Sequence, residues 1–518
     1  MRVHEHSNRP YGWVGQLSER RARLTPGRVG LVDATTGREY TYAELDRRAN
    51  RTARLLRAHG VGAGDRVAVV SRNRPELVDL YFATAKVGAV LAPLSHRLAP
   101  PALAALLADT EASALVVEEP FAGDSQTAVA EGPATELPML LLGGESTGEF
   151  EPYDADRRDE TPVETVDRAL SDPHLFLHTG GSTGLPKQVV QTYGGVLWNG
   201  FNTILSWGLR PDDTTPMVFP LFHTGGWNVL TVPLFQLGGT VVISREVEPG
   251  RVLDLVESRA ASVLVAVPAV LRFMTEHERW PETDLSSLRF VKSGGGPCRE
   301  GVIEAWSERG VTISQGYGLT ECGPNNFAMP EGFPRERTDT IGVPGLFVDA
   351  RVVDDDGQEL PPGEIGELEL ASPHAGDRYW HNETETAETF GDWVSTGDLA
   401  SVDEAGYFSI EGRKKNMFVS GGENVFPPEV ENAITDHPAV DEAVLVPVPD
   451  EQWGEVGKAV VESDDPLELS ELRGFLDGRI ARYKLPRTLE VVDEIPTSGV
   501  SKIDRTAVRE RFAEETDR

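Results

Sequence analysis

The first hundred residues alternate short apolar runs with segments of helical periodicity. Thr41 and Glu44 have the spacing of a capping box at the start of an amphipathic helix. Further on, a helix that begins at Pro75 lies between apolar runs at 66–70 and 89–94. A strand, a helix and a second strand in this order indicate a parallel strand pair with the helix packed against the sheet.

The same alternation returns between residues 240 and 315. Four apolar runs of strand length are separated by amphipathic segments of helix length. Strands that alternate with helices form parallel sheets covered on both faces, so the pattern predicts a doubly wound α/β core. The predicted strands are 240–244, 262–267, 289–293 and 312–315, and the predicted helices are 249–259, 268–277 and 299–309.

Two other regions lack this alternation. Residues 119–172 are acidic and rich in Gly, Pro, Ser and Thr, which predicts a long surface excursion without catalytic residues. Residues 347–413 contain short apolar runs broken by Asp-Gly and Pro-Pro-Gly, a pattern typical of antiparallel hairpins or a small β-barrel.

Beyond residue 413, helices are predicted at 428–436 and 468–482 among short strands. We therefore expect two domains. The first, 1–412, would combine doubly wound α/β subdomains with a small β-barrel-like part, and the second, 413–518, would be a small α+β domain.

Charge excludes several classes of protein. The 518 residues include 83 acidic and 49 basic side chains, and the formal net charge is −34. Binding to nucleic acid or to an anionic membrane surface requires a basic face, so neither is expected. Only eight of the basic residues are lysines, a composition that resembles proteins of salt-loving organisms; a high-GC genome that encodes Arg in place of Lys is the alternative.

Cysteine content and hydropathy indicate the compartment. Cys298 and Cys322 are too few and too far apart for a disulfide framework or a paired-cysteine metal site. The amino terminus has no apolar signal core, and the longest apolar stretch, 260–271, is shorter than the roughly 20 residues that span a bilayer. We expect a cytoplasmic protein without a membrane span.

The strongest chemical signal is a segment rich in glycine and hydroxyl groups directly after a predicted strand. Its glycines allow backbone N–H groups to approach a polyphosphate, while the hydroxyls add donors and the lysine adds a cation. The segment lacks the Gly-Lys-[Ser/Thr] ending of a Walker P-loop. Its residues are Thr179, Gly180, Gly181, Ser182, Thr183, Gly184 and Lys187.

The same segment also allows a different class of protein, a serine hydrolase. Gly180 to Gly184 matches the short G-x-S-x-G pattern of a serine hydrolase with Ser182 as the nucleophile. Asp398 and His437 follow in the order that such a triad requires. The pattern is weak, because Pro186 falls where the helix after the nucleophile should run.

An ordered series of motifs resembles the adenylate-forming (AMP-forming) enzymes, which include acyl-CoA synthetases, peptide-synthetase adenylation domains and firefly luciferase. Each motif alone is short, but the order is specific and extends over almost the whole chain. Besides 179–187, the motifs are Pro220–Gly226, Ser293–Pro297, Gly316–Glu321, Ser395–Asp398, Gly412–Asn424 and Ser501–Arg505.

The resemblance implies an ATP site that binds Mg²⁺. The 179–187 segment would hold the β- and γ-phosphates, and Glu321, beside Thr320, would bind the metal ion. Tyr317, between Gly316 and Gly318, would stack on adenine, while Asp398 and Arg413 would contact the ribose. The strand end that would lie against adenine and the acyl group is Gly294, Gly295, Gly296 and Pro297.

The resemblance also implies a two-step reaction with a mobile small domain. Lys502 would stabilise charge between the attacking carboxylate and the α-phosphate, and Lys415 would be the hinge. His223 would border the acyl and thiol paths. Ser501 stands where the family commonly has Gly. This difference affects the expected geometry of the loop before Lys502 and not the identity of the lysine. The surface facing CoA would comprise Ser420, Gly421, Gly422 and Glu423.

These features predict an ATP-dependent ligase that joins a carboxylic acid, such as a fatty or other acyl acid, to coenzyme A through an acyl-adenylate. An aryl or succinylbenzoate substrate and transfer to a carrier protein remain alternatives. A homodimer is left open as the oligomeric state. The predicted acyl pocket is lined by His223, Trp227, Asn228, Gly295, Asn325 and Asn326.

Overall fold

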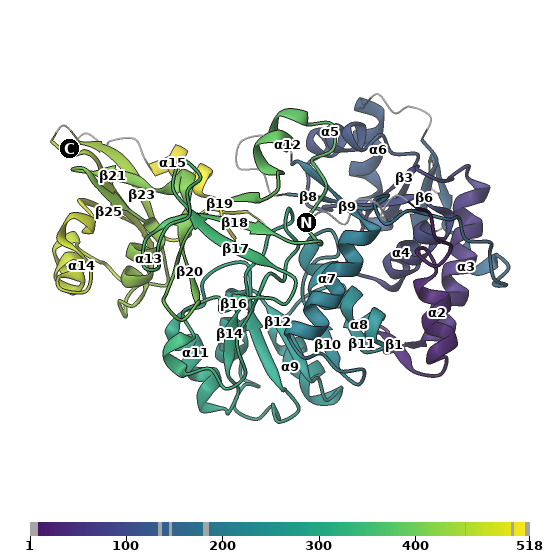
Figure 1. Ribbon diagram of the computed structural model, residues 1–518, viewed down its shortest axis with the longest axis horizontal. Coiled ribbons are helices and arrows are strands. Elements are labelled where there is room, and N and C mark those ends of the chain that lie inside the picture. Colours follow the sequence, from purple (N-terminus) through teal and green to yellow (C-terminus); the bar gives the residue numbers. More distant parts are fainter. Residues whose placement is uncertain are drawn as a thin grey trace. The chain divides into compact units, whose positions relative to one another are not determined.

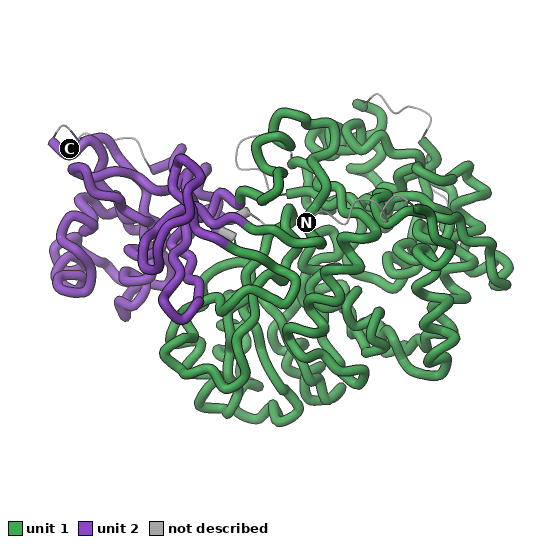
Figure 2. Tube along the Cα trace, viewed as in Figure 1, with its two compact units in different colours: residues 1–181, 185–350, 370–395 green, residues 182–184, 351–369, 396–518 purple. Residues whose placement is uncertain are grey.

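The structure is a computed structural model that describes residues 9–132, 137–144, 148–179, 186–450, 452–498 and 502–512. The chain divides into two compact units (Figure 2). Unit 1 comprises Met1–Gly181, Leu185–Ala350 and Leu370–Ser395, and unit 2 consists mainly of Arg351–Glu369 and Thr396–Arg518. The domain boundary expected at residue 412 stays a prediction.

A seven-stranded sheet forms one half of unit 1 (Figure 1), with the strand order β7-β6-β5-β3-β4-β8-β9. Its strands are parallel except β9, which runs antiparallel to β8. The strands are β3 (Arg66–Val70), β4 (Val90–Leu94), β5 (Ala114–Glu118), β6 (Met139–Leu142), β7 (Phe150–Pro152), β8 (Pro173–His178) and β9 (Gln188–Thr192).

Helices cover both faces of this sheet, as a doubly wound fold requires. Alternate residues of β3 belong to different cores: Val67 and Val69 pack with α3 (Tyr42–Ala58) and α4 (Pro75–Val87). Ala68 and Val70 face the opposite side, where α5 (Pro100–Thr110) and α6 (Ala122–Glu131) pack. The change of side follows from the strand order, because the chain crosses from β3 to β4 in one direction and from β4 to β5 in the other.

The predicted capping box is confirmed. The Thr41 hydroxyl accepts from the Glu44 backbone N–H, and the Glu44 carboxylate accepts from the Thr41 backbone N–H, so α3 begins at Tyr42.

Two further sheets complete the core of unit 1. One has the order β10-β11-β1-β2 and the other is the parallel sheet β12-β13-β14. Their elements are β1 (Val29–Asp33), β2 (Glu39–Thr41), β10 (Thr214–Met217), β11 (Thr240–Ile243), β12 (Val263–Ala266), β13 (Phe290–Ser293) and β14 (Ile313–Gln315), with α2 (Leu17–Leu24), α7 (Tyr193–Ser206), α8 (Thr231–Leu237), α9 (Pro249–Ser258), α10 (Pro268–Glu276), α11 (Glu300–Glu308) and α12 (Glu383–Thr389).

Unit 2 contains a four-stranded sheet and a mixed sheet covered by helices. The first has the order β17-β18-β19-β20, and the second has the order β22-β21-β24-β23 with β25 beside β24. The elements are β17 (Asp349–Val353), β18 (Gly366–Ala371), β19 (Val394–Val402), β20 (Phe408–Arg413), β21 (Phe418–Ser420), β22 (Glu423–Val425), β23 (Glu442–Asp450), β24 (Gly454–Glu462), β25 (Thr488–Val492), α13 (Pro427–Thr435), α14 (Leu469–Leu476) and α15 (Arg505–Phe512).

Two local predictions were wrong. Residues 119–172 are not only a surface excursion, because they contain α6 and the fully buried strand β6. The helix predicted at 468–482 ends at Leu476, since Asp477 and Gly478 leave helical geometry and Gly478 has a φ of 80°. In the part of the chain that is described, no helix is both long and apolar enough to cross a bilayer.

Lys86 and Asp46 form a buried ion pair between α4 and α3, with 2.9 Å between Nζ and Oδ1. We expect Lys86→Met to lower the free energy of unfolding by about 3–5 kcal/mol, because Asp46 would lose its ammonium partner. Denaturant unfolding measures this loss. Arg23→Met removes the same charge from an exposed pair with Glu19 and should cost less than about 1 kcal/mol; equal losses would contradict the interpretation.

Candidate active site

The glycine-rich segment connects two antiparallel strands. Thr179 follows β8 and Lys187 precedes β9, and the Thr179 backbone N–H donates to the Lys187 carbonyl at 2.8 Å. The two ends of the segment are therefore fixed against each other. Five of its predicted phosphate-binding residues lie outside the described residues: Gly180, Gly181, Ser182, Thr183 and Gly184.

This connection contradicts the serine-hydrolase alternative. A nucleophile elbow is a turn from a strand into a helix, whereas Ser182 falls between two strands. The two residues that a triad with Ser182 would require are also bonded to other groups. Asp398 pairs with Arg413, and His437 Nδ1 accepts from the backbone N–H of Ala439 at 3.2 Å.

Tyr379 connects the predicted phosphate cation with the predicted metal ligand. Its hydroxyl donates to Glu321 Oε1 at 2.7 Å, and Lys187 Nζ lies 5.0 Å from the centre of its ring. Burial and the neighbouring Glu321 carboxylate raise the pKa of Tyr379 well above its ordinary value, so the hydroxyl keeps its proton and remains a donor. Lys187 also pairs with Glu385 on α12.

Glu321 suits Mg²⁺ that is shared with phosphates. Among the described residues, no group of three or more His, Cys, Asp or Glu side chains could hold a metal ion. Mg²⁺ in nucleotide sites is commonly held by one or two protein carboxylates together with substrate phosphates, so a single carboxylate near the cation predicted to bind phosphate fits this ion.

Two glycine motifs follow neighbouring parallel strands and so lie at the same edge of their sheet. Gly294 to Pro297 follow β13, and Gly316 to Gly318 follow β14. Gly316 N–H donates to the Ser293 carbonyl at 2.7 Å, which joins the two motifs. A Cβ at Gly294 or Gly296 would meet nothing within 4 Å, so these positions leave room for a ligand against the backbone.

Tyr317 and Thr320 are held by their neighbours. The Tyr317 ring contacts Phe327 edge-on at 5.8 Å, and its carbonyl accepts from Asn326 N–H. The Thr320 carbonyl accepts from Gln191 Nε2 at 2.7 Å, which fixes the turn that carries Glu321 against β9.

His223 lies in a cluster of aromatic rings. Its ring is 4.5 Å from that of Phe222 and 5.8 Å from that of His178. Burial lowers the pKa of His178 to about 4, and its Nε2 accepts from the Ser95 backbone N–H at 3.1 Å, so His178 is neutral at physiological pH. No motif in the sequence marks His178 as part of the site, and none marks Tyr379 or Glu385.

Four residues predicted to line the acyl pocket are buried in the interior. Trp227 is fully buried, stacks on Tyr81 and donates to the Leu221 carbonyl. Three asparagines are 0–1% exposed and are bonded to neighbouring groups; for example, Asn326 Oδ1 contacts His374 Nε2 at 3.0 Å. These side chains are packed against neighbouring groups, and their role in lining the acyl pocket stays a prediction. The residues are Trp227, Asn228, Asn325 and Asn326.

Asp398 and Arg413 face each other within unit 2. They are directly opposed on β19 and β20, and Arg413 Nε lies 2.7 Å from Asp398 Oδ1. Asp398 is buried while half of the Arg413 side chain is exposed. This pair is therefore a preformed acceptor and donor on one hairpin. Lys415 follows in a short 3₁₀ turn.

The remaining predicted residues of unit 2 lie on two hairpins. Gly421 and Gly422 have positive φ values, 61° and 90°, and form the two-residue turn between β21 and β22. A Cβ at Gly421 would lie 2.4 Å from the Trp453 ring, so this position requires glycine. Ser420 and Glu423 flank the turn. Lys502 is the first residue of β27 (Lys502–Ile503).

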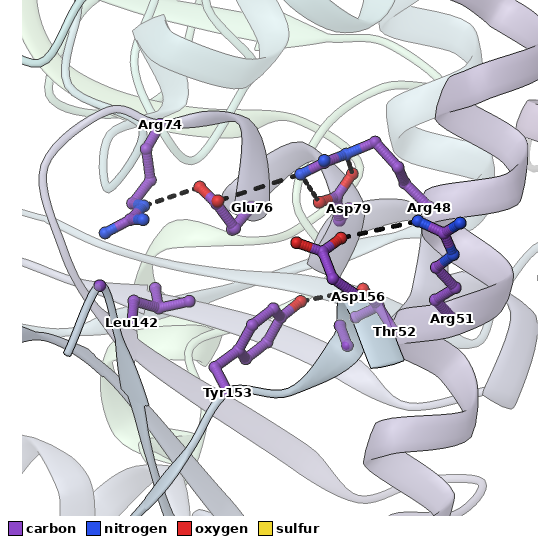
Figure 3. A pocket seen from close by; sticks show the side chains of 11 residues that line it. Arg48, Arg51, Thr52, Arg74, Glu76, Asp79, Leu142, Tyr153 and Asp156 are labelled. Carbon is purple, nitrogen blue, oxygen red and sulfur yellow. Dashed lines mark hydrogen bonds and ion pairs between the residues drawn. The ribbon is translucent and has the colours of Figure 1, made fainter. Parts of the chain in front are cut away.

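A polar cavity of about 220 Å³ in unit 1 (Figure 3) is separate from the predicted site residues. Three guanidinium groups and three carboxylates line it, and they are paired with one another. This compensation leaves no excess positive charge for a phosphate. The charged lining residues are Arg48, Arg51, Arg74, Glu76, Asp79 and Asp156.

Comparison with known proteins identifies the class. Residues 18–380 match the AMP-binding enzyme family, and residues 429–502 match the AMP-binding enzyme C-terminal domain. Feruloyl-CoA synthase from Amycolatopsis sp is 38% identical, with 96% of this chain and 99% of the relative covered. Long-chain-fatty-acid–CoA ligase FadD13 from Mycobacterium tuberculosis is 33% identical, with 96% and 98% covered. ATP-bound MatB from Rhodopseudomonas palustris superposes with a TM-score of 0.88 at 29% identity, with 96% and 99% covered.

The chain belongs to the AMP-binding enzyme family of adenylate-forming proteins. Within that family it is an AMP-forming acyl-CoA synthetase, which joins an acid to CoA with ATP through an adenylate.

Gly318 offers a test of the turn that precedes Glu321. A Cβ at this position would lie 2.2 Å from the Pro324 carbonyl, a contact that the backbone must move to relieve. We expect Gly318→Ala to destabilise the protein by about 1–3 kcal/mol, measured as a fall in the thermal unfolding midpoint. The matched variant Gly316→Ala meets only an ordinary 3.5 Å contact; an equal or larger fall there would disprove the steric argument.

Proposed function

We propose that the acid joined to CoA is an aromatic acid of the feruloyl type, with a fatty or other acyl acid as the second candidate. The support for the first is the higher identity to feruloyl-CoA synthase over nearly the full length of both chains. The support for the second is the lower but equally extensive identity to a long-chain-fatty-acid–CoA ligase.

The observation that carries the proposed ATP site is the link from Lys187 through Tyr379 to Glu321. Lys187, with Thr179 and the segment between them, would bind the β- and γ-phosphates. Mg²⁺ on Glu321 would neutralise the charge that leaves with pyrophosphate. Tyr317, in the second of the two glycine motifs, would then stack on adenine, and Asp398 and Arg413 would hold the ribose hydroxyls.

Other residues would serve the two chemical steps. Lys502 would stabilise the negative charge that develops as the carboxylate attacks the α-phosphate. His223, supported by the neutral His178, would border the path of the acyl group and the thiol. Lys415 would be the hinge between the two steps, and the hairpin at 420–423 would face CoA.

Acid-dependent exchange of labelled pyrophosphate into ATP tests this proposal. We expect exchange with hydroxycinnamic acids to exceed exchange with fatty acids by at least about tenfold, the discrimination available from a shaped apolar pocket. Fatty acids as the better substrates would select the second candidate. No exchange with any acid in the panel would contradict both.

Lys502→Ala tests the division between the two steps. We expect adenylation to fall by roughly 10²-fold or more, the scale of removing a group that stabilises transition-state charge, while CoA attack on preformed adenylate persists. Single-turnover assays of each step make the comparison. Lys484→Ala, which removes a lysine paired with Glu429 on the surface of unit 2, should leave both rates near wild type. Equal losses in both steps for Lys502→Ala would exclude a role confined to adenylation.

A further inference from the structure

Lys187, the cation nearest to the proposed phosphate site, is already bound to an acidic side chain. Its Nζ contacts Glu385 Oε2, and both side chains remain partly exposed, at 34% and 39%. A ligand phosphate can therefore reach this ammonium. The contact lies within unit 1, together with Tyr379 and Glu321.

We propose that Glu385 is an internal competitor for the nucleotide phosphates at Lys187 and thereby sets the affinity for ATP and its dependence on salt. This inference rests on the proposed role of Lys187 as a phosphate ligand. It adds a specificity-determining residue on α12, outside every motif that marks the ATP site in the sequence.

The backbone around Glu385 is held in place by neighbouring residues. Asn382 caps α12, and its Oδ1 accepts from the Glu385 backbone N–H at 3.2 Å. Thr386, the next residue, binds Tyr379 twice: its hydroxyl accepts from the Tyr379 backbone N–H and also contacts the Tyr379 carbonyl. The first turn of α12 is thus fixed to the same tyrosine whose ring lies against Lys187.

In this pair, the Glu385 carboxylate occupies the position at the Lys187 ammonium that a phosphate oxygen would take. A lysine ammonium is a compact point charge with three hydrogen-bond donors. A carboxylate oxygen and a phosphate oxygen therefore compete for binding to it. A polyphosphate carries more charge than one carboxylate and should displace it. Because the pair is exposed, its own attraction is small, and its removal should tighten ATP binding by about two- to fivefold.

Salt should reduce the effect of Glu385 on ATP binding. Screening weakens the Lys187–Glu385 pair and therefore removes part of the competition as ionic strength rises. In a variant without Glu385, salt still weakens ATP binding but has no competing ion pair to weaken. Its affinity should fall more steeply with salt than that of the wild type, and the two should converge.

Calorimetric titration with ATP in magnesium buffer, without any acid, provides the test. We expect Glu385→Gln to bind ATP about two- to fivefold more tightly than wild type at low salt, and the difference to shrink in 1 M salt by screening. The control is Glu383→Gln, which removes the same charge from the same first turn of α12. A similar gain in both variants, or none in Glu385→Gln, would overturn the inference.

A second variant background, Lys187→Gln, distinguishes failure of this inference from failure of the proposed function. In Lys187→Gln, the gain from Glu385→Gln should vanish, because the competition acts only through the ammonium. Persistence of the gain would overturn the inference. Failure of the wild-type chain to bind ATP at all would instead refute the proposed function.

Discussion

The parallel sheet β12-β13-β14 determines where the proposed adenylate site lies. Its strands end in the same direction, so the turns after β13 and β14 lie side by side and are joined by the Gly316–Ser293 hydrogen bond. Glu321 follows the second turn and is oriented by the Tyr379 hydroxyl. A glycine edge and the carboxylate proposed to bind the metal ion are therefore positioned by backbone geometry together with the Tyr379 side chain.

Charge in this molecule has to be considered locally. The chain carries −34, yet its proposed ligands are polyanions. The ammonium of Lys187 and the guanidinium of Arg413 are each next to an acidic side chain, Glu385 and Asp398, so neither position is a bare positive patch. At Lys187, selectivity for a phosphate over another anion would then depend on displacement of the weakly held Glu385, which a highly charged ligand achieves more readily than a simple ion.

Features that depend on neighbouring residues could be predicted from the sequence. The capping box at Thr41 forms within four residues, and the strands near 66–70 and 290–293 carry their own apolar pattern. Features that depend on distant partners could not. Strand β6 is buried although the surrounding sequence is polar, and the Tyr379–Glu321 contact joins residues that no local pattern relates. The motif around Trp227 predicts a pocket residue, but its burial and its stacking on Tyr81 depend on a distant segment that the motif does not reveal.

The backbone bond between Thr179 and Lys187 also bears on how this region can diverge among relatives. Because both ends of the segment are anchored to paired strands, a change of residue type between them leaves the register of the sheet unaltered. Substitutions in this segment, which is proposed to bind phosphate, should then carry little penalty in the free energy of folding.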